Sequence, residues 1–362
     1  MNVLSSLMRY VEAKIFPILI LFIFIANSSC QSKEVKISSL TYPSYQDEKL
    51  FQGMTLVAPR DSAMHSSLKQ LKALGVNSIA VVPYAFSRLG EPRVFYNQSE
   101  YQWWGERPQG VEYTIRQAKK NGFKVFLKPQ VYIPGSWTGA LSFELDSEYN
   151  LWEKEYEEYI LSMAKIAERY QVELFCIGTE FKAHSIKRAS FWQSLIKKLR
   201  EVYSGPLTYA ANWDEYEQIS FWEALDYIGV DAYFPLLDQK KMDTHKLAGE
   251  WKRYKSSLQA ISEKFDRPIL FTEYGYMSLS ECTHNAWEKE ANRRVAVADY
   301  ACQAQAIEVL FDTFWESDWW MGGFYWKWYL DPSTHESRPE TDYSPQGKPS
   351  ELVFKKWFES KS

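Results

Sequence analysis

The sequence predicts a single (β/α)₈ barrel, an α/β fold class, and three observations support it. Short apolar runs typical of β-strands alternate with amphipathic helical segments along most of the chain, which indicates parallel βα units. Eight such runs occur in sequence, and eight sequential units favour a closed barrel. The chain also lacks the glycine-rich phosphate loops, G-x-G-x-x-G or G-x-x-x-x-G-K-[ST], that an open doubly wound sheet would normally carry.

The predicted strands come at regular intervals, and several end on polar or aromatic residues. They span Gly53–Leu56, Ser78–Pro83, Lys124–Pro129, Leu174–Glu180, Leu207–Asn212, Tyr227–Tyr233, Ile269–Glu273 and Gly323–Trp328. The clearest helices between them are Ser62–Leu74, Gly110–Lys120 and Leu151–Tyr170, and the first two end at a Gly or an Asn-Gly pair. The 93 residues that separate Glu180 from Glu273 accommodate three βα units of at least about 30 residues each.

The first 29 residues differ in composition from the rest of the chain. Two basic residues precede an apolar run of 12 residues, Ile15–Ala26, which is shorter than the ~20 residues that span a bilayer. Because small residues and Cys30 follow, residues 1–29 resemble a bacterial lipoprotein signal cleaved before a lipidated Cys30. We therefore expect a tether over residues 30–45, a catalytic domain over 46–362, and membrane anchoring in the bacterial cell envelope. An ordinary secretory signal with an incidental Cys30 is the alternative, and the protein would then be secreted.

Charge and metal-binding patterns exclude several classes of function. The formal net charge of −4 comes from mixed signs, so no basic footprint for nucleic acid is present. The five histidines form no HExxH or HxH pattern, so we do not expect a catalytic metal. We also expect no other cofactor, and we expect the protein to be a monomer. Strand alternation puts Cys176 inside the barrel, while Cys282 and Cys302 could either pair or remain free thiols.

Two glutamates, Glu180 and Glu273, end the fourth and seventh predicted strands. The C-terminal rim of a (β/α)₈ barrel is where active sites lie, so both carboxylates are expected there. Hydrolysis of a glycosidic bond needs one carboxylic acid to protonate the leaving oxygen and one carboxylate to attack or to activate water. A single strand-end glutamate is more often simply solvated, but this pair shares the rim with polar and aromatic strand ends, among them Lys128, Asn212 and Tyr233.

Twelve of the 15 tryptophans form two predicted groups. Tryptophan offers a rigid apolar face on which a pyranose ring can stack. Those near loops or strand ends are candidate sugar platforms: Trp103, Trp104, Trp137, Trp213, Trp326 and Trp328. Those within helical patterns are expected to pack against the barrel: Trp152, Trp192, Trp222, Trp251, Trp287 and Trp357.

Four ordered motifs carry a resemblance to a known family. They are Phe175-Cys-Ile-Gly-Thr-Glu180-Phe, Leu207-Thr-Tyr-Ala-Ala-Asn-Trp-Asp214, Leu225-Asp-Tyr-Ile-Gly-Val-Asp-Ala-Tyr-Phe-Pro235 and Gly323-Phe-Tyr-Trp-Lys-Trp328. Together they resemble glycoside hydrolase family 113, which belongs to the (β/α)₈ clan A and whose known members are retaining endo-β-1,4-mannanases. The resemblance runs from about Phe51 to Phe358.

The resemblance implies a role for several residues. Glu180 would be the acid/base, Glu273 the nucleophile, and Tyr233 a donor to the nucleophile. The clan usually has Asn before its acid/base, whereas this chain has Thr179, so the contact to the sugar 2-hydroxyl must be weaker or come from elsewhere, with Asn212 as a candidate. The predicted substrate-binding residues are Lys128, Asn212, Trp213, Tyr233, Trp326, Trp137 and Trp104, with Trp326 as the floor of the site.

The function predicted from these features is retaining hydrolysis of β-1,4-mannosidic bonds in mannan-type or glucomannan-type chains. Two alternatives remain open at this point. The same chemistry could act on another β-linked hexan or on short oligosaccharides. A barrel lipoprotein that binds sugar without cleaving it is the second alternative, although it would have no need for both carboxylates.

Overall fold

The computed structural model describes residues 50–61, 67–97, 102–238, 241–285, 288, 296–331 and 338–359. The predicted leader and tether, including Cys30, lie outside the described residues, as does Trp287. Within the described part, no helix is long and apolar enough to cross a membrane.

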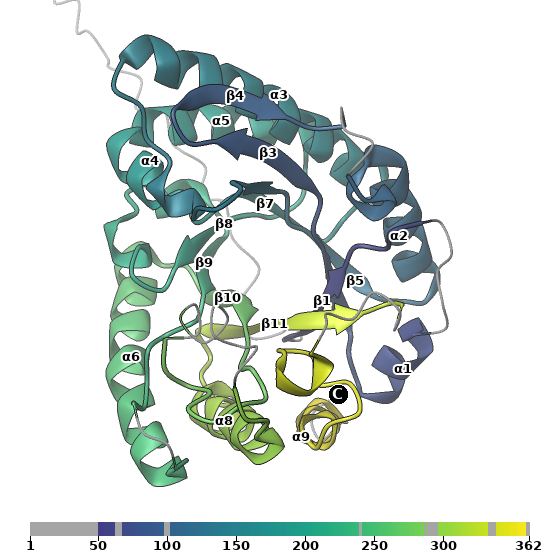
Figure 1. The fold of residues 1–362 in the computed structure, drawn as a ribbon. Helices are drawn as coiled ribbons and strands as arrows, with labels where there is room; N and C mark the ends of the chain where they lie inside the picture. Colours follow the sequence, from purple (N-terminus) through teal and green to yellow (C-terminus); the bar gives the residue numbers. More distant parts are fainter. Residues whose placement is uncertain are drawn as a thin grey trace, which may run out of the picture. The chain divides into compact units, whose positions relative to one another are not determined.

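Eight parallel strands close into a barrel, which confirms the predicted fold class (Figure 1). Its strands, in spatial order, are β1 (Phe51–Val57), β11 (Trp320–Tyr329), β10 (Ile269–Tyr274), β9 (Tyr227–Asp231), β8 (Leu207–Asn212), β7 (Leu174–Thr179), β5 (Lys124–Leu127) and β2 (Ser78–Val81). Each coincides with one predicted strand. The main differences are at the carboxyl ends, where Pro83, Pro129, Glu180 and Tyr233 lie past the last paired residue.

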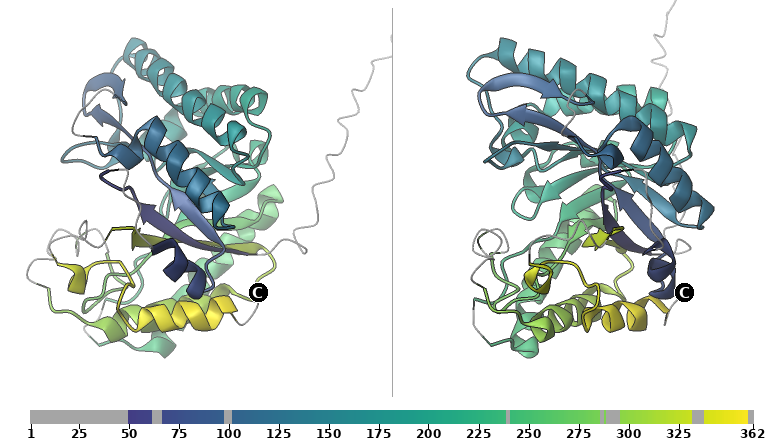
Figure 2. Two further views of the ribbon diagram at one scale, coloured as in Figure 1. Left: turned by 90° about the vertical axis from the view of Figure 1, so that its right-hand side faces the viewer. Right: turned by 45° about the vertical axis from the view of Figure 1, so that its right-hand side comes forward.

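Helices surround the ring of strands, as Figures 1 and 2 show from three sides. They are α1 (Ser67–Ala73), α2 (Pro108–Lys120), α3 (Asp146–Arg169), α4 (Lys182–Lys187), α5 (Ala189–Val202), α6 (Thr244–Phe265), α8 (Tyr300–Phe314) and α9 (Ser350–Glu359). The large indoles expected to pack against the barrel do so: Trp152, Trp192, Trp222 and Trp251 are fully buried, and Trp357 is partly buried against the same core.

An apolar cluster fills part of the barrel interior. Its members come from the strands and alternate with residues that face the helices: Phe51, Ala80, Phe126, Leu174, Cys176, Ala210, Tyr227, Leu270, Met321 and Phe324. The Phe324 ring lies at the centre, 4.8 Å from the ring of Phe126 and 5.6 Å from that of Phe51. A Cβ on Gly53 would lie 2.4 Å from this ring, so the position requires glycine. This apolar cluster does not extend to the carboxyl ends of the strands, where polar residues line the barrel instead.

A small three-stranded sheet, which the sequence did not predict, stands beside the carboxyl ends of the barrel strands. Its order is β4 (Glu91–Phe95), β3 (Tyr84–Arg88) and β6 (Gln130–Tyr132), so it is assembled from the segments that follow β2 and β5. One of its faces packs on α3, which Figure 1 shows behind β4. There the Trp152 indole donates a hydrogen bond of 3.0 Å to the Ser87 hydroxyl. The helix therefore fixes the sheet relative to the barrel.

Candidate active site

A cleft of about 550 Å³ opens where the carboxyl ends of the barrel strands meet the small sheet. Both predicted catalytic glutamates line it. The other lining residues come from six barrel strands or the loops after them and from the small sheet: Tyr84, Gln130, Val131, Trp137, Thr138, Thr179, Asn212, Trp213, Asp214, Asp231, Tyr233, Trp326, Lys327 and Tyr343. The fold thus brings together residues that lie up to 259 positions apart in the sequence, from Tyr84 to Tyr343.

Glu273 lies in β10 and is held by three donors. Lys128 Nζ lies 2.6 Å and Gln130 Nε2 2.8 Å from its Oε1, and the Tyr233 hydroxyl donates to Oε2 at 2.9 Å. The Tyr233 contact is the one that the family resemblance implied. Hydrogen bonds from three donors, one of them cationic, stabilise the ionised form of a carboxyl group. Because Glu273 is only 7 % exposed, these donors also fix its orientation.

Lys128 lies beneath the cleft, fully buried, and does not form part of its wall. Besides Glu273 it contacts both carboxylate oxygens of Asp231, at 3.0 and 3.1 Å, so its three N–H donors are all used. Burial alone would lower the pKa of Lys128, but the Asp231 and Glu273 carboxylates raise it above its ordinary value. This placement differs from the expected direct contact with sugar hydroxyls. Lys128 instead holds the Glu273 carboxylate in place and provides a positive charge beside it.

Asp231 shares this buried network. Its Oδ1 accepts a hydrogen bond of 2.7 Å from the Thr272 hydroxyl, next to Glu273 in the sequence. Burial raises the pKa of Asp231 to about 7, with a further contribution from Glu273, although the Lys128 ammonium opposes the rise. One buried cation therefore faces two carboxylates, and a negative charge remains in its neighbourhood when both are ionised.

Glu180 follows β7 directly and has a different environment. Its backbone adopts the left-handed region with φ of 55°, which is uncommon for a residue with a side chain. Its Oε2 accepts one hydrogen bond, of 2.6 Å, from the indole N–H of Trp137. Burial and the Asp231 and Glu273 carboxylates raise the pKa of Glu180 to about 8, while the Trp137 N–H and the Lys128 charge oppose the rise. The carboxyl group is therefore protonated at neutral pH.

Trp137 reaches Glu180 from the loop after β6. The side chain is 41 % exposed, and its ring lies directly over Gly139, where a Cβ would be 2.3 Å from the indole. Any side chain at position 139 would displace the ring. The Trp137 ring thus packs directly against the backbone of Gly139, which has no side chain to displace it. The rest of the Trp137 side chain remains accessible to solvent.

The residue before the acid/base position and the candidate contact to the sugar 2-hydroxyl both lie at the cleft. Thr179 and Asn212 both line it. The Asn212 amide donates to Asp214 Oδ1 at 2.9 Å, and Asp214 in turn pairs with Lys182 at 2.5 Å. This chain of contacts fixes Asn212 on the wall of the cleft.

Some of the tryptophans predicted to be sugar platforms line the cleft and others do not. Trp137, Trp213 and Trp326 line the cleft. Trp104 does not: its ring packs 5.3 Å from that of Tyr113 on α2. Trp103 is also absent from the lining, and the Arg60 guanidinium lies 4.7 Å from its ring.

Trp328 corrects one expectation. It was a candidate sugar platform, and alternation along a strand would put it on the same face as Trp326, but it is 1 % exposed and belongs to the core. In the pairing of β1 with β11, Thr55 is opposite Trp326 and Leu56 is opposite Trp328, so Lys327 is an extra residue. A bulge of this kind changes the alternation of faces along a strand. Trp326 therefore points to the cleft while Trp328 does not.

Several cleft residues had no sequence prediction. Gln130 was recognisable only by its position two residues after Lys128, just past a strand end. Tyr84 comes from β3, and Lys327 occupies the bulge in β11. Tyr343 comes from the segment after β11, where no motif marks it, and its ring lies 6.1 Å from that of Tyr233, which binds Glu273.

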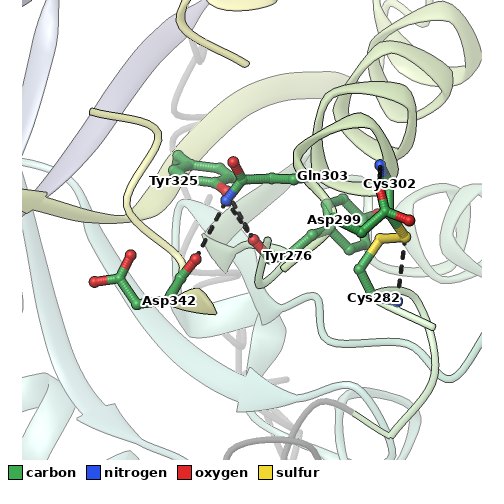
Figure 3. Close-up of a disulfide and its surroundings, with 7 residues drawn as sticks. All are labelled: Tyr276, Cys282, Asp299, Cys302, Gln303, Tyr325 and Asp342. Atoms are coloured by element: carbon green, nitrogen blue, oxygen red, sulfur yellow. Dashed lines mark hydrogen bonds between the residues drawn. A yellow bond between two sulfur atoms is a disulfide. The ribbon is translucent and has the colours of Figure 1, made fainter. Parts of the chain in front are cut away.

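Buried polar contacts hold the segment that carries Tyr343 (Figure 3). The Gln303 side-chain amide, on α8, donates to the backbone carbonyls of Tyr276 and Tyr343 at 2.9 and 3.0 Å. The Tyr325 hydroxyl contacts the same two carbonyls at 3.1 and 2.9 Å. One residue before Gln303, Cys302 forms a disulfide with Cys282, which answers the question that the sequence left open. The loop after β10 and the segment after β11 are thus both tied to α8.

The arrangement provides one carboxylate stabilised in its charged form and one carboxyl group kept protonated. That is the pair of groups that hydrolysis of a glycosidic bond requires. Among the described residues, no group of three or more His, Cys, Asp or Glu side chains could hold a metal ion.

A protein-family model, Glycoside Hydrolase Family 113, matches residues 58–348. Among solved structures, the chain is similar to the GH113 beta-mannanase from Alicyclobacillus acidocaldarius in complex with ManMIm, at 24 % identity over 88 % of this chain and 100 % of that chain, with a TM-score of 0.73. It is also similar to a GH113 beta-1,4-mannanase, at 24 % identity over 86 % of this chain and 100 % of that one, with a TM-score of 0.72. A beta-glucuronidase from Faecalibacterium prausnitzii is more distant, at 11 % identity over 86 % of this chain and 49 % of that chain, with a TM-score of 0.58. No curated protein matches the chain.

Proposed function

Since the chain belongs to glycoside hydrolase family 113, we propose that it cleaves β-1,4-mannosidic bonds in mannan-type or glucomannan-type chains with retention of configuration. Membership of the family makes the chain a glycoside hydrolase. The bond, the stereochemical course and the roles of individual residues are the proposal. The printed names of its structural relatives, beta-mannanase and beta-1,4-mannanase, support this choice of substrate.

In the proposed mechanism, Glu180 protonates the glycosidic oxygen while Glu273 attacks the anomeric carbon. The bond to the leaving sugar breaks as the bond between Glu273 and the sugar forms. Glu180, now ionised, takes a proton from water, and that water releases the sugar from Glu273 and returns the enzyme to its starting state. Retention results from two successive inversions at the same carbon.

One observation carries the assignment of roles: the two glutamates have opposite surroundings. Glu273 accepts hydrogen bonds from Lys128, Gln130 and Tyr233, as a nucleophile that must remain charged would require. The pKa of Glu180 is raised to about 8 by burial and by neighbouring carboxylates, as a general acid at neutral pH would require. If the roles were exchanged, Glu273 would have to be protonated beside three hydrogen-bond donors, and Glu180 would have to be ionised in surroundings that raise its pKa.

Two variants test the roles. Glu273→Gln should lower turnover by at least about a thousandfold while the chain still folds, because the amide cannot form the glycosyl intermediate. Glu180→Ala should lose most of its activity and regain part of it with azide on an activated aryl glycoside, because azide replaces the water that lacks its base. A Glu273→Gln enzyme with near-normal rates would refute the nucleophile assignment.

The substrate is tested by product profiles of the mature chain on mannan, glucomannan, xylan and cello-oligosaccharides. We expect cleavage of the first two and an initial product with the β configuration at its new reducing end. Preferential cleavage of cello-oligosaccharides would instead identify another β-linked hexan as substrate. Thr179 makes this experiment informative, since it stands where the clan usually has the Asn that contacts the sugar 2-hydroxyl.

We further propose that the protein is anchored in the bacterial envelope through a lipid on Cys30. The support is the sequence of residues 1–30 alone. Replacing Cys30→Ser should move the protein from the membrane fraction to the soluble fraction, because a protein without its acyl chains lacks its membrane affinity. Unchanged fractionation of the variant would refute lipidation.

A further inference from the structure

The three-stranded sheet β4–β3–β6 has two chemically different faces. Ala85, Ser87, Val94 and Val131 are buried on the face toward α3. The other face carries four rings: Tyr84, Phe86, Phe95 and Tyr132. Pairing sets this arrangement, because Phe86 is opposite Tyr132 on one side and opposite Phe95 on the other, and paired residues point to the same face. We call these four residues the outer aromatic face.

The outer aromatic face begins inside the catalytic cleft. Tyr84 is paired with Gln130, both line the cleft, and Gln130 donates to the nucleophile Glu273. Two positions further along the same strands come Phe86 and Tyr132, on the same face and roughly 7 Å along the strand from Tyr84 and Gln130. A ligand chain that leaves the cleft in this direction therefore passes over these rings.

These rings are not part of a packed core. The Tyr132 side chain is 51 % exposed, and its ring lies edge-on to the ring of Phe86, with centroids 6.2 Å apart. Phe86 and Phe95 are both only partly buried. The sheet itself is held by its other face, through the contact of Trp152 with Ser87 and that of Glu155 with the Val94 N–H at 2.8 Å. The Arg93 guanidinium lies 5.7 Å from the Phe95 ring, so Tyr132 is the most accessible of the four rings. The outer aromatic face is thus fixed by the packing of the sheet and open to solvent at Tyr132.

We propose that the outer aromatic face is a distal sugar subsite, which binds pyranose units of the same β-linked chain whose scissile bond lies between Glu180 and Glu273. The inference rests on the proposed function and adds to it a preference for long chains. Pyranose rings present C–H faces that stack on aromatic rings, and a fixed aromatic side chain loses little entropy when a ligand binds. The outer aromatic face is continuous with the cleft, so the ligand it binds is expected to be the part of the substrate chain that extends out of the cleft. A different ligand on this face would obstruct that chain.

The test compares chain lengths across matched variants of the full protein. Tyr132→Ala removes the exposed ring, Tyr132→Phe keeps it, and Tyr300→Ala removes a similarly exposed ring, 41 % accessible, at the start of α8. Kinetics are measured on β-1,4-manno-oligosaccharides from the disaccharide to the hexasaccharide and on an aryl mannoside. We expect Tyr132→Ala to lower kcat/KM on the hexasaccharide by about fivefold, mainly through KM, with changes below about twofold on the shortest substrates. Both other variants should match the unmodified protein.

Two patterns would overturn the proposal: an equal loss on short and long substrates, which indicates a disturbed catalytic centre, or no loss on any length. Calorimetric titration of the hexasaccharide into the same proteins provides a readout independent of turnover. If the unmodified protein acts on a different β-linked hexan, the mannan proposal fails, and the same length series in that sugar decides the subsite. If it binds no hexasaccharide of either sugar, the subsite is refuted as well.

Discussion

The two carboxyl groups proposed as catalytic, Glu180 and Glu273, are held in contrasting ways. Glu273 lies within a barrel strand and is tied to Lys128 and Gln130 from the β5 side and to Tyr233 after β9. Glu180 lies just past its strand, in a left-handed backbone conformation, and among the described residues its carboxyl group has one hydrogen bond, from the partly exposed Trp137. The proposed nucleophile is thus built into the barrel. The proposed acid is bound at the rim by one side chain of the described part of the chain.

The charge balance of the site explains why the two environments depend on each other. Three acidic groups, Glu180, Asp231 and Glu273, lie near the fully buried cation Lys128, and of these three the Lys128 ammonium contacts Asp231 and Glu273. The negative charge of those two groups contributes, after burial, to the raised pKa of Glu180. The network that holds Glu273 therefore also helps to keep Glu180 protonated.

The largest effect is expected from removal of the buried cation. Lys128→Met leaves two carboxylates buried without their partner, and loss of one member of a buried ion pair costs about 3–5 kcal/mol of stability. Urea unfolding at neutral pH measures this loss, and activity should fall strongly because Glu273 loses its cationic donor. The comparison variant is Lys198→Met, which breaks a pair with Glu157 in which the lysine is 48 % exposed. A surface pair of this kind contributes at most about 1 kcal/mol. Similar losses in both variants would contradict the structural role of Lys128.

The barrel strands and the helices, which depend on local sequence patterns, were predicted correctly from the sequence. The eight strands have short β-type runs, the helices have punctuated ends, and the two glutamates stand at strand ends, so one stretch of sequence suffices for each. Lys128 shows the limit. Its position at a strand end was visible, but its direction depends on Asp231 and Glu273, which lie 103 and 145 residues away. No local pattern reports whether a rim lysine points to solvent or to buried acids.

Other features arise only when distant segments meet. The small sheet pairs β3 with a three-residue strand, β6, that is too short to give an alternation signal. Tyr343 reaches the cleft because Gln303 and Tyr325 hold its backbone. The bulge at Lys327 puts Trp328 in the core, against the alternation that its sequence spacing suggested. These are consequences of tertiary packing, which spacing along one strand does not encode.

A smaller effect, on stability, separates the acid from the nucleophile. The pKa of Glu180 is raised to about 8 from an ordinary value of 4.5, so between these values the folded chain keeps a proton that the unfolded chain releases. Folding stability contributed by this group therefore falls as pH rises from 4.5 to 8. Glu180→Gln removes this penalty, and we expect a gain in stability of up to a few kcal/mol above pH 8 and none below pH 4.5.

Thermal unfolding of Glu180→Gln across this pH range measures the effect. Glu201→Gln, an exposed change on α5, serves as the control and should alter stability by less than about 0.5 kcal/mol. A gain for Glu180→Gln that is the same at low and high pH would show that ionisation of Glu180 is not its cause.

The smallest effect concerns the hydrogen bond from Trp137 to Glu180, the proposed acid. The Trp137 N–H lies 2.6 Å from Glu180 Oε2 and lowers the pKa of Glu180 by stabilising the ionised form. Trp137→Phe keeps a ring over Gly139 but removes the donor, so the pKa should rise. The alkaline limb of kcat/KM, which reports loss of the proton on the acid in the free enzyme, should move to higher pH by up to about one unit. Trp326→Phe changes another indole of the cleft wall, one with no hydrogen bond to Glu180, and should leave the limb in place while changing KM. If both variants shifted the limb equally, the cause would be a general change in the cleft. If neither did, the Trp137 hydrogen bond would have no influence on the protonation of Glu180, and the rim would hold its acid by burial and charge alone.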